Sequence, residues 1–334
     1  KMLRAVLRGF YFRMPYFIRE NSLIEMLRNL VKDNFKRDDE LLIENYIDKK
    51  VISLTDQDLD NFVGYALNCV GETSGDFIEY ISSIQCDFDY GQHPQDPTGQ
   101  NYYDFQRDLY KRVSGKDYDV SFEKSDVVVS EALREPYRYL EFNQSRVSGE
   151  LAAISLLLKE LNLNVSDKVL ECGGGRGHIT EQLCLLGLDV TAIEIDKNFC
   201  KIVEKRLSPY RKKFKILNTN FENGVNGIED DSLAAVLFHN CFHHSYDHRG
   251  LVRSISNKLK KGGALFFLNE PIYSDFPIPW GLRLDGESLF QIRRNGWYEL
   301  GFNQKYFRGM LESNGFEVIE YNQDGNHLIK AVFE

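Results

Sequence analysis

The chain has 334 residues, of which 43% are hydrophobic and 27% charged, and this composition excludes a disordered, collagen-like or coiled-coil protein. It carries 50 acidic and 41 basic residues, a net charge of −9, so nucleic acid is not expected as its main partner. No apolar run approaches the roughly 18 residues that a membrane span requires. The 6 cysteines are scattered, which suggests reduced thiols and a cytoplasmic location. Lys1 precedes Met2, as in a segment of a longer protein.

Helical spacing of apolar residues predicts a mainly helical N-terminal region over residues 1–95. Residues 1–20 interleave arginines with aromatic rings, which suits docking on the rest of the protein or on a partner subunit of a homo-oligomer. The alternative is peripheral contact of this segment with an anionic surface at the inner face of the membrane. Turn-forming residues at 93–99 mark a boundary, after which residues 96–147 are predicted to form a lid or adaptor segment.

Strand and helix patterns alternate through residues 148–334, which predicts parallel β-α-β units. The predicted parallel strands are 168–172, 189–196, 213–218, 232–242 and 264–270. A helix is expected over residues 250–263, ending at its two glycines. The fold class predicted here is a doubly wound, mostly parallel, Rossmann-like α/β sheet.

The end of the chain departs from this alternation. Residues 316–321 and 327–334 predict two strands joined by a turn, which would close the sheet as an antiparallel edge hairpin. Residues 272–302 interrupt the pattern before the last helix, and we interpret them as an insertion on the acceptor side of the domain.

The first predicted strand leads into Gly173-Gly174-Gly175-Arg176-Gly177, where backbone N–H groups can approach a ligand that a Cβ would exclude. A dinucleotide fingerprint would need glycine where His178 stands, and the phosphate-binding G-x-x-x-x-G-K-[ST] pattern is absent from the sequence here. Glu194 ends the second strand, where a carboxylate can accept both hydroxyls of a ribose. The alternatives are a structural tight turn and an acid solvated at the sheet rim.

Five motifs in order resemble the class I S-adenosylmethionine-dependent methyltransferases over roughly residues 145–334. They are VLECGGGRGHITEQL, VTAIEID, NTNFENG, the stretch from LFHNCFHH to LFFLNEP, and FNQKYFRGMLESNGFEVIEY. The resemblance implies a Rossmann-like methyltransferase domain and S-adenosylmethionine as its cofactor. The cofactor-binding residues expected from the loop and the resemblance are Glu171, Gly173, Gly175, Gly177, Glu194, Ile195, Asn220, Phe221 and Asn240.

Two positions depart from the family pattern. Asn220 is neutral where the family usually has an acid that meets the adenine amine, and Ala234 replaces the aspartate that commonly opens the fourth strand. These departures leave the site in place, but they imply weaker cofactor binding or help from other residues.

Four histidines fall within ten residues at the end of the predicted fourth strand. His243 and His244 are predicted to act as catalytic base or acceptor-orienting group, because histidine suits proton transfer at neutral pH. The alternative for both is packing or capping in the loop. His239 with His243, and His244 with His248, have a spacing that binds zinc on a helix, but His239 is expected in a strand, so no metal is predicted.

Aromatic, acidic and basic side chains in the insertion suit a sugar, because rings stack on apolar sugar faces and charged groups meet hydroxyls. The predicted acceptor-binding residues are Trp280, Arg283, Asp285, Arg293, Arg294, Trp297 and Tyr298. The alternative is a structural loop with ion pairs at its rim.

A narrower resemblance, carried by residues 102–161 and 279–302, is to methyltransferases encoded with bacterial surface-polysaccharide assembly. It implies methylation of a small-molecule or glycan acceptor, at oxygen of a sugar in polysaccharide biosynthesis. Two other functions stay open: a non-catalytic nucleoside-binding protein for assembly or regulation, and a nucleic-acid methyltransferase.

Overall fold

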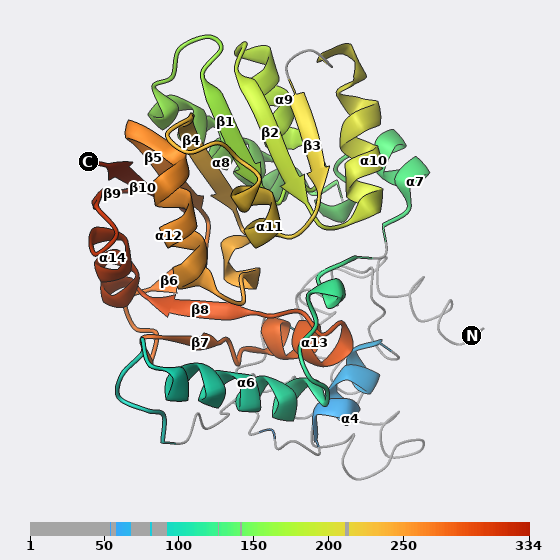
Figure 1. Ribbon diagram of the computed structural model, residues 1–334. Helices are drawn as coiled ribbons and strands as arrows, with labels where there is room; N and C mark the ends of the chain where they lie inside the picture. The colour runs from blue at the N-terminus through green and yellow to red at the C-terminus, as the bar shows by residue number, and fades with distance from the viewer. Residues whose placement is uncertain are drawn as a thin grey trace, which may run out of the picture. The chain divides into compact units, whose positions relative to one another are not determined.

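Figure 1 shows the computed structural model, which divides the chain into two compact units, Lys1–Tyr90 with Leu284–Phe290, and Gly91–Arg283 with Gln291–Glu334. The structure describes residues 54, 58–67, 81, 92–125, 127–140, 142–210 and 214–334. Residues 1–20, with their predicted membrane or subunit contact, lie outside the described residues, as does most of the region predicted to be helical. None of the described helices combines the length and apolar character needed to cross a membrane.

Short helices make up the described chain before the sheet. Helix α4 belongs to the first unit and spans Asp58–Tyr65. The segment predicted to be a lid or adaptor lies in the second unit. It contains α6 Gln100–Ser114, the 3₁₀ turn η2 Val120–Phe122, α7 Val129–Arg134 and the 3₁₀ turn η3 Arg138–Leu140.

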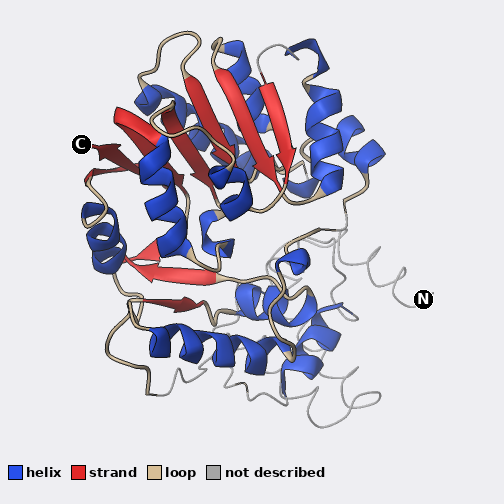
Figure 2. Cartoon of the chain, viewed as in Figure 1, coloured by secondary structure: helices blue, strands red, loops and turns tan. Residues whose placement is uncertain are grey.

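A seven-stranded sheet forms the centre of the second unit, in the order β3-β2-β1-β4-β5-β10-β9 (Figure 2). Its strands are β1 Lys168–Cys172, β2 Asp189–Glu194, β3 Phe214–Asn218, β4 Leu233–His239, β5 Leu259–Leu268, β9 Phe316–Gln323 and β10 Asn326–Phe333. The first five are parallel, and β10 pairs antiparallel with both β5 and β9. The predicted mostly parallel sheet with an antiparallel hairpin at one edge is confirmed.

Helices cover both faces of the sheet (Figure 1). Helices α8 Gln144–Leu161 and α9 His178–Leu185 lie behind it, and α11 Phe221–Asn226 and α12 His248–Lys258 lie in front. This is why β4 carries six successive buried residues, because a strand covered on both sides has no solvent face. The remaining long helices of the sheet domain are α10 Lys197–Arg206 and α14 Gln304–Glu312.

The helix predicted over residues 250–263 is shorter than expected. Helix α12 ends at Lys258, and β5 already begins at Leu259, so the two glycines lie inside the strand. The register between β4 and β5 shifts here, and Gly262 has a positive φ of 77°. A Cβ on Gly263 would lie 2.8 Å from the carbonyl oxygen of Lys260 and 3.0 Å from that of Leu233. The glycines therefore permit a bulge beside β4 rather than a helix end.

The insertion predicted over residues 272–302 contains a second, three-stranded sheet that the sequence did not indicate. Strands β6 Ile272–Tyr273, β7 Trp280–Leu282 and β8 Leu300–Asn303 form it in the order β6-β8-β7. Helix α13 Gly286–Arg294 follows β7 in the chain. Strands of two to four residues carry too little periodicity to be recognised from sequence.

A buried carboxyl group links β1 to α9 behind the glycine-rich turn. Glu171 is 5% exposed, and its Oε2 accepts a hydrogen bond of 2.5 Å from Thr180 Oγ1. Burial raises the pKa of Glu171 to about 8, the Thr180 hydroxyl opposes that rise, and the nearby Glu194 carboxylate adds to it. The folded chain therefore holds a proton on Glu171 at a pH where the unfolded chain has released it.

We predict that Glu171→Gln removes a component of the pH dependence of stability. Between about pH 5 and 8 the free energy of unfolding of the wild-type chain should fall more steeply than that of the variant, by up to about 1.4 kcal/mol per pH unit. Urea denaturation of both chains at pH 5, 6, 7 and 8 measures the difference. Equal pH slopes would show that Glu171 is ionised in the folded chain, and Glu204→Gln, on the exposed side of α10, is the control.

Candidate active site

A cavity of about 410 Å³ opens at the carboxyl ends of the parallel strands, where ligands bind in open α/β sheets. We call it the strand-end cavity. It is lined by Tyr118, Val120, Glu123, Ser125, Gly173, Glu194, Ile195, Phe199, Thr219, Asn220, Phe221, Glu222, Cys241, His244, Ser245, Tyr246, Asp247 and Trp297. The loops after β1, β2, β3 and β4 all contribute, so residues distant in sequence meet around one space.

The glycine-rich turn brings backbone close to the cavity at one residue. Gly173 lines it and has a positive φ of 74°, and a Cβ there would lie 2.7 Å from Cys241 Sγ. The Cys241 thiol in turn donates to the carbonyl oxygen of Cys172 at 3.0 Å. Only glycine therefore fits between β1 and the loop after β4. Gly175 and Gly177 also have positive φ but do not line the cavity, and neither does Glu171.

Glu194 is held at the cavity by two backbone groups. Its Oε2 accepts from the N–H of Gly175 at 2.9 Å, and its Oε1 accepts from the N–H of Asp196 at 2.8 Å. Burial raises the pKa of Glu194, although these N–H groups oppose the rise. Each carboxylate oxygen keeps a second lone pair for hydroxyl donors. A fixed acceptor of this kind suits a ribose.

Three further predicted residues lie on the same wall. Ile195 and Phe221 give apolar surface, and Phe221 packs edge to face on Phe238 with ring centroids 5.6 Å apart. Asn220 caps α11 by accepting from the N–H of Asn223 at 2.9 Å, and it also faces the cavity. Asn240 does not line the cavity; it has a φ of 51°, and its N–H donates to the Leu268 carbonyl oxygen.

The loop after β4 is organised by one carboxylate at the end of β5. Glu270 accepts hydrogen bonds from the backbone N–H groups of Cys241, Phe242 and His243 at 2.8, 2.9 and 3.2 Å. Its Oε2 also lies 2.9 Å from His243 Nδ1. Burial opposes ionisation, but the His243 hydrogen bond and charge, together with these N–H groups, lower the pKa of Glu270. The loop therefore forms the 3₁₀ turn η5 Phe242–His244 over a buried anion.

The two predicted catalytic histidines have different surroundings. His243 is 4% exposed and does not line the strand-end cavity, whereas His244 does. His244 Nδ1 lies 3.2 Å from Glu123 Oε2, and its ring meets Trp297 edge to face. Burial opposes protonation of His244, but the carboxylates of Glu123, Glu299 and Glu270 raise its pKa to about 9. Of the two, His244 is the one that can touch a ligand in the cavity.

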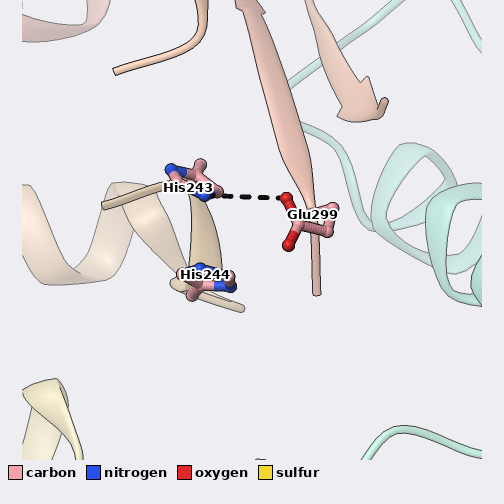
Figure 3. A group of neighbouring side chains, drawn as sticks. All are labelled: His243, His244 and Glu299. Atoms are coloured by element: carbon pink, nitrogen blue, oxygen red, sulfur yellow. Dashed lines mark ion pairs between the residues drawn. The ribbon is translucent and has the colours of Figure 1, made fainter. Parts of the chain in front are cut away.

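The histidine pairs with helical spacing do not converge. His239 lies in β4 with its Nδ1 3.9 Å from Glu150, and His248 is buried with its Nε2 3.0 Å from the Tyr306 hydroxyl. Burial lowers the pKa of His248 to about 3. His243 and His244 instead lie beside Glu299, a residue of the chain leading into β8 (Figure 3).

The predicted acceptor-binding residues are dispersed. Trp297 lines the cavity, whereas Trp280 is fully buried and donates its Nε1–H to the Pro97 carbonyl oxygen at 2.8 Å. Tyr298 is buried among the rings of Tyr110, Tyr118 and Tyr246. The charged members do not line the cavity: Arg283 lies 3.7 Å from Glu299, Arg293 donates to the Val113 carbonyl oxygen, Arg294 is exposed, and Asp285 belongs to the other unit.

Two carboxylates that shape the site were not predicted from sequence, Glu270 behind the turn after β4 and Glu123 on the cavity. Glu270 had a usable signal, because it follows a buried strand as Glu194 does. Glu123 reaches the site from the segment after α6, and its Oε1 accepts from the Tyr298 N–H at 2.7 Å. No periodicity or motif marks that position in the sequence.

Residues 170–267 match the model of a family described as a methyltransferase domain. Among curated relatives, the chain is 37% identical over 65 residues to an rRNA adenine N-6-methyltransferase of Limosilactobacillus reuteri, which covers 20% of this chain and 26% of that protein. It is 43% identical over 54 residues to ribosomal RNA small subunit methyltransferase A of Thermotoga neapolitana, covering 16% and 21%. The chain thus spans about a quarter of the curated relatives it matches.

Among solved structures, the chain is similar to a SAM-dependent methyltransferase from Aquifex aeolicus, with a TM-score of 0.43 and 15% identity. The match covers 63% of this chain and 100% of that chain. A geranyl diphosphate methyltransferase has a TM-score of 0.44 and 15% identity, covering 55% and 77%.

The residues of the strand-end cavity fit the cofactor of such a domain. A Cβ at Gly173 would fill the turn, Glu194 offers a fixed acceptor, and Ile195, Phe199 and Phe221 supply apolar surface for a base. The family match over residues 170–267 and this cavity support a class I methyltransferase domain whose cofactor is S-adenosylmethionine.

Proposed function

We propose that the chain transfers a methyl group from S-adenosylmethionine to a hydroxyl oxygen of a small-molecule or glycan acceptor. The observation that carries this proposal is the shared cavity, because Gly173 and Glu194 on the cofactor side line the same space as His244, Glu123 and Trp297. When bound, the cofactor supplies an electrophilic methyl group, and the protein must align the acceptor and exclude water.

Support for the cofactor side comes from Glu194 and Asn220. The Glu194 carboxylate is fixed by two N–H donors and would hold ribose hydroxyls, and the Asn220 amide would meet the edge of the base. Phe221 and Ile195 would lie against the base, as the resemblance implies. The two backbone N–H groups hold the Glu194 carboxylate in one orientation before a ligand binds, so a ribose would not have to order it.

Support for the acceptor side comes from His244 and its neighbours. Methylation of a hydroxyl forms an oxygen–carbon bond, breaks the sulfur–carbon bond of the cofactor and releases the hydroxyl proton. His244 and Glu123 are adjacent at the cavity: the His244 imidazole would orient the hydroxyl, and the Glu123 carboxylate would take up its proton. Trp297 would pack on an apolar ring face, which suits a sugar.

The second candidate is a nucleic-acid adenine, and it is favoured by the short similarity to rRNA methyltransferases. Against it stands the net charge of −9, since binding a polyphosphate backbone requires a surplus of lysine and arginine. We therefore rank a small, uncharged or weakly charged acceptor first and propose a glycan of surface-polysaccharide biosynthesis within that class.

Calorimetric titration with S-adenosylhomocysteine tests the cofactor assignment. Glu194→Gln should raise the Kd by about 10–100-fold, because a hydrogen bond to a charged group is worth about 1.5–3 kcal/mol. Glu204→Gln on α10 is the matched control and should leave the Kd unchanged, and NAD⁺ should not bind. An unchanged Kd for Glu194→Gln would refute its role.

A second prediction concerns the acceptor side. Transfer of labelled methyl from S-adenosylmethionine should occur to a member of a panel of sugar nucleotides, oligosaccharides and phenols, and not to an rRNA transcript. His244→Gln should lower kcat/KM by about 10²-fold, as expected when the acceptor oxygen loses the group that orients it. It should leave the Kd for S-adenosylhomocysteine unchanged.

His327→Gln in the hairpin provides the control for this variant, since His327 lies near Glu320 and outside the strand-end cavity. Labelling of rRNA alone would replace the proposed acceptor class by the second candidate. Activity of His244→Gln equal to that of the control would remove His244 from the mechanism.

A further inference from the structure

We propose that His243, His244 and Glu299 bind one divalent transition-metal ion such as Zn²⁺, and that this ion holds the acceptor oxygen at the strand-end cavity. One ligand atom from each residue lies within 4.8 Å of those from the other two (Figure 3). Among the residues that the structure describes, this is the one group of three His, Cys, Asp or Glu side chains whose ligand atoms lie this close together. Ion binding stands on its own, whereas the role toward the acceptor rests on the proposed function.

His243 is oriented as a metal-binding histidine would be. Glu270 Oε2 lies 2.9 Å from its Nδ1, and three backbone N–H groups hold that carboxylate in place. With Nδ1–H donating to Glu270, loss of the other ring proton on metal binding would leave the lone pair of His243 on Nε2. A carboxylate behind the ring is the usual outer partner of a ligating histidine.

The free nitrogen of His243 faces Glu299 at a ligand-to-ligand spacing. Its Nε2 lies 3.6 Å from Glu299 Oε2, which is longer than a hydrogen bond (Figure 3). Two ligands of a tetrahedral zinc ion, each bonded at about 2.0–2.2 Å, lie roughly 3.4 Å apart. The two atoms therefore already stand near the separation that one shared ion imposes.

His244 adds the third ligand and connects the group to the cavity. Its Nδ1 lies 3.2 Å from Glu123 Oε2, and an ion bound to His244 would replace the proton that this carboxylate favours on the ring. His244 and Glu123 both line the strand-end cavity. A coordination position left open by the three ligands would therefore face the space proposed for the acceptor.

Charge favours a cation at this place. Three carboxylates surround the histidines, and the side chains of Glu123, Glu270 and Glu299 are 9%, 0% and 7% exposed. Arg283 Nη1 lies 3.7 Å from Glu299 and offsets one of them. A divalent ion between the histidines and Glu299 would take the place of protons on the two rings and face these carboxylates at short range.

The donor set selects the class of ion. Two imidazoles with one carboxylate suit Zn²⁺ and its neighbours in the first transition row, whereas Mg²⁺ and Ca²⁺ prefer oxygen ligands alone. Three protein ligands with an open position are the arrangement of catalytic zinc. An ion there would polarise the acceptor hydroxyl and make its proton easier to remove.

Metal binding to the complete, untagged chain tests the site. Protein stripped with a chelator and titrated with Zn²⁺ should bind one ion per chain, which calorimetry and elemental analysis measure. His243→Gln and Glu299→Gln should each weaken binding by at least about 100-fold, since loss of even an outer partner of a ligand costs about 10–100-fold. His239→Gln in β4 is the matched control and should bind as the wild type does.

A spectroscopic readout decides the ligands even if a variant fails to fold. The X-ray absorption spectrum of the wild-type zinc complex should show imidazole and oxygen scatterers at about 2.0–2.2 Å. Sulfur at about 2.3 Å would place the ion on cysteines and overturn the proposal. Wild-type affinity in folded His243→Gln, or no stoichiometric binding, would overturn it as well.

Assays with and without the ion separate this inference from the proposed function. Stripped enzyme should bind S-adenosylhomocysteine normally but lose at least about tenfold in methyl transfer, with activity restored by Zn²⁺. If the stripped enzyme transfers methyl groups as fast as the zinc-loaded enzyme, the ion has no catalytic role, while the proposed function stands. If zinc binds stoichiometrically to the two histidines but no hydroxyl acceptor is methylated, the metal site stands and the proposed function is wrong.

Discussion

The buried carboxylate of Glu270 is the constraint on which the site depends. It gathers the backbone N–H groups of residues 241–243 and the Nδ1 of His243, and so fixes the turn after β4. That turn places Cys241 against Gly173, His243 against Glu299, and His244 on the cavity wall. Without an anion at the end of β5, four polar groups would be buried unpaired, so the loop and the site form together.

The strand-end cavity has two halves, which meet where Gly173 packs on Cys241 with no room for a larger residue. The half proposed for the cofactor is built from the turns after β1 and β2, where Gly173 admits Cys241 Sγ at a distance that excludes a Cβ. The half proposed for the acceptor is built from the turn after β4 together with Glu123 and Trp297, which come from outside the parallel sheet. A ligand on one half is thus within reach of side chains that belong to the other.

The sheet was predictable because its strands are long, buried runs that alternate with helices, and because the glycine turn and Glu194 follow strands in order. The three-stranded sheet was not, because its strands are too short to show a period. The bulge at Gly262 and Gly263 resembled a helix end, since glycine serves both. His243 and His244 were found by their position, but Glu123 and Glu299 join them only through tertiary contacts that spacing does not encode.

A crystal structure of the chain with S-adenosylhomocysteine and zinc tests the central claim, that one cavity holds the cofactor beside the histidine group. We expect ribose hydroxyls on the Glu194 carboxylate, the sulfur directed toward the His244 side of the cavity, and an anomalous peak between His243, His244 and Glu299. The nucleoside bound outside the strand-end cavity, or bound there without contact to Glu194, would contradict it.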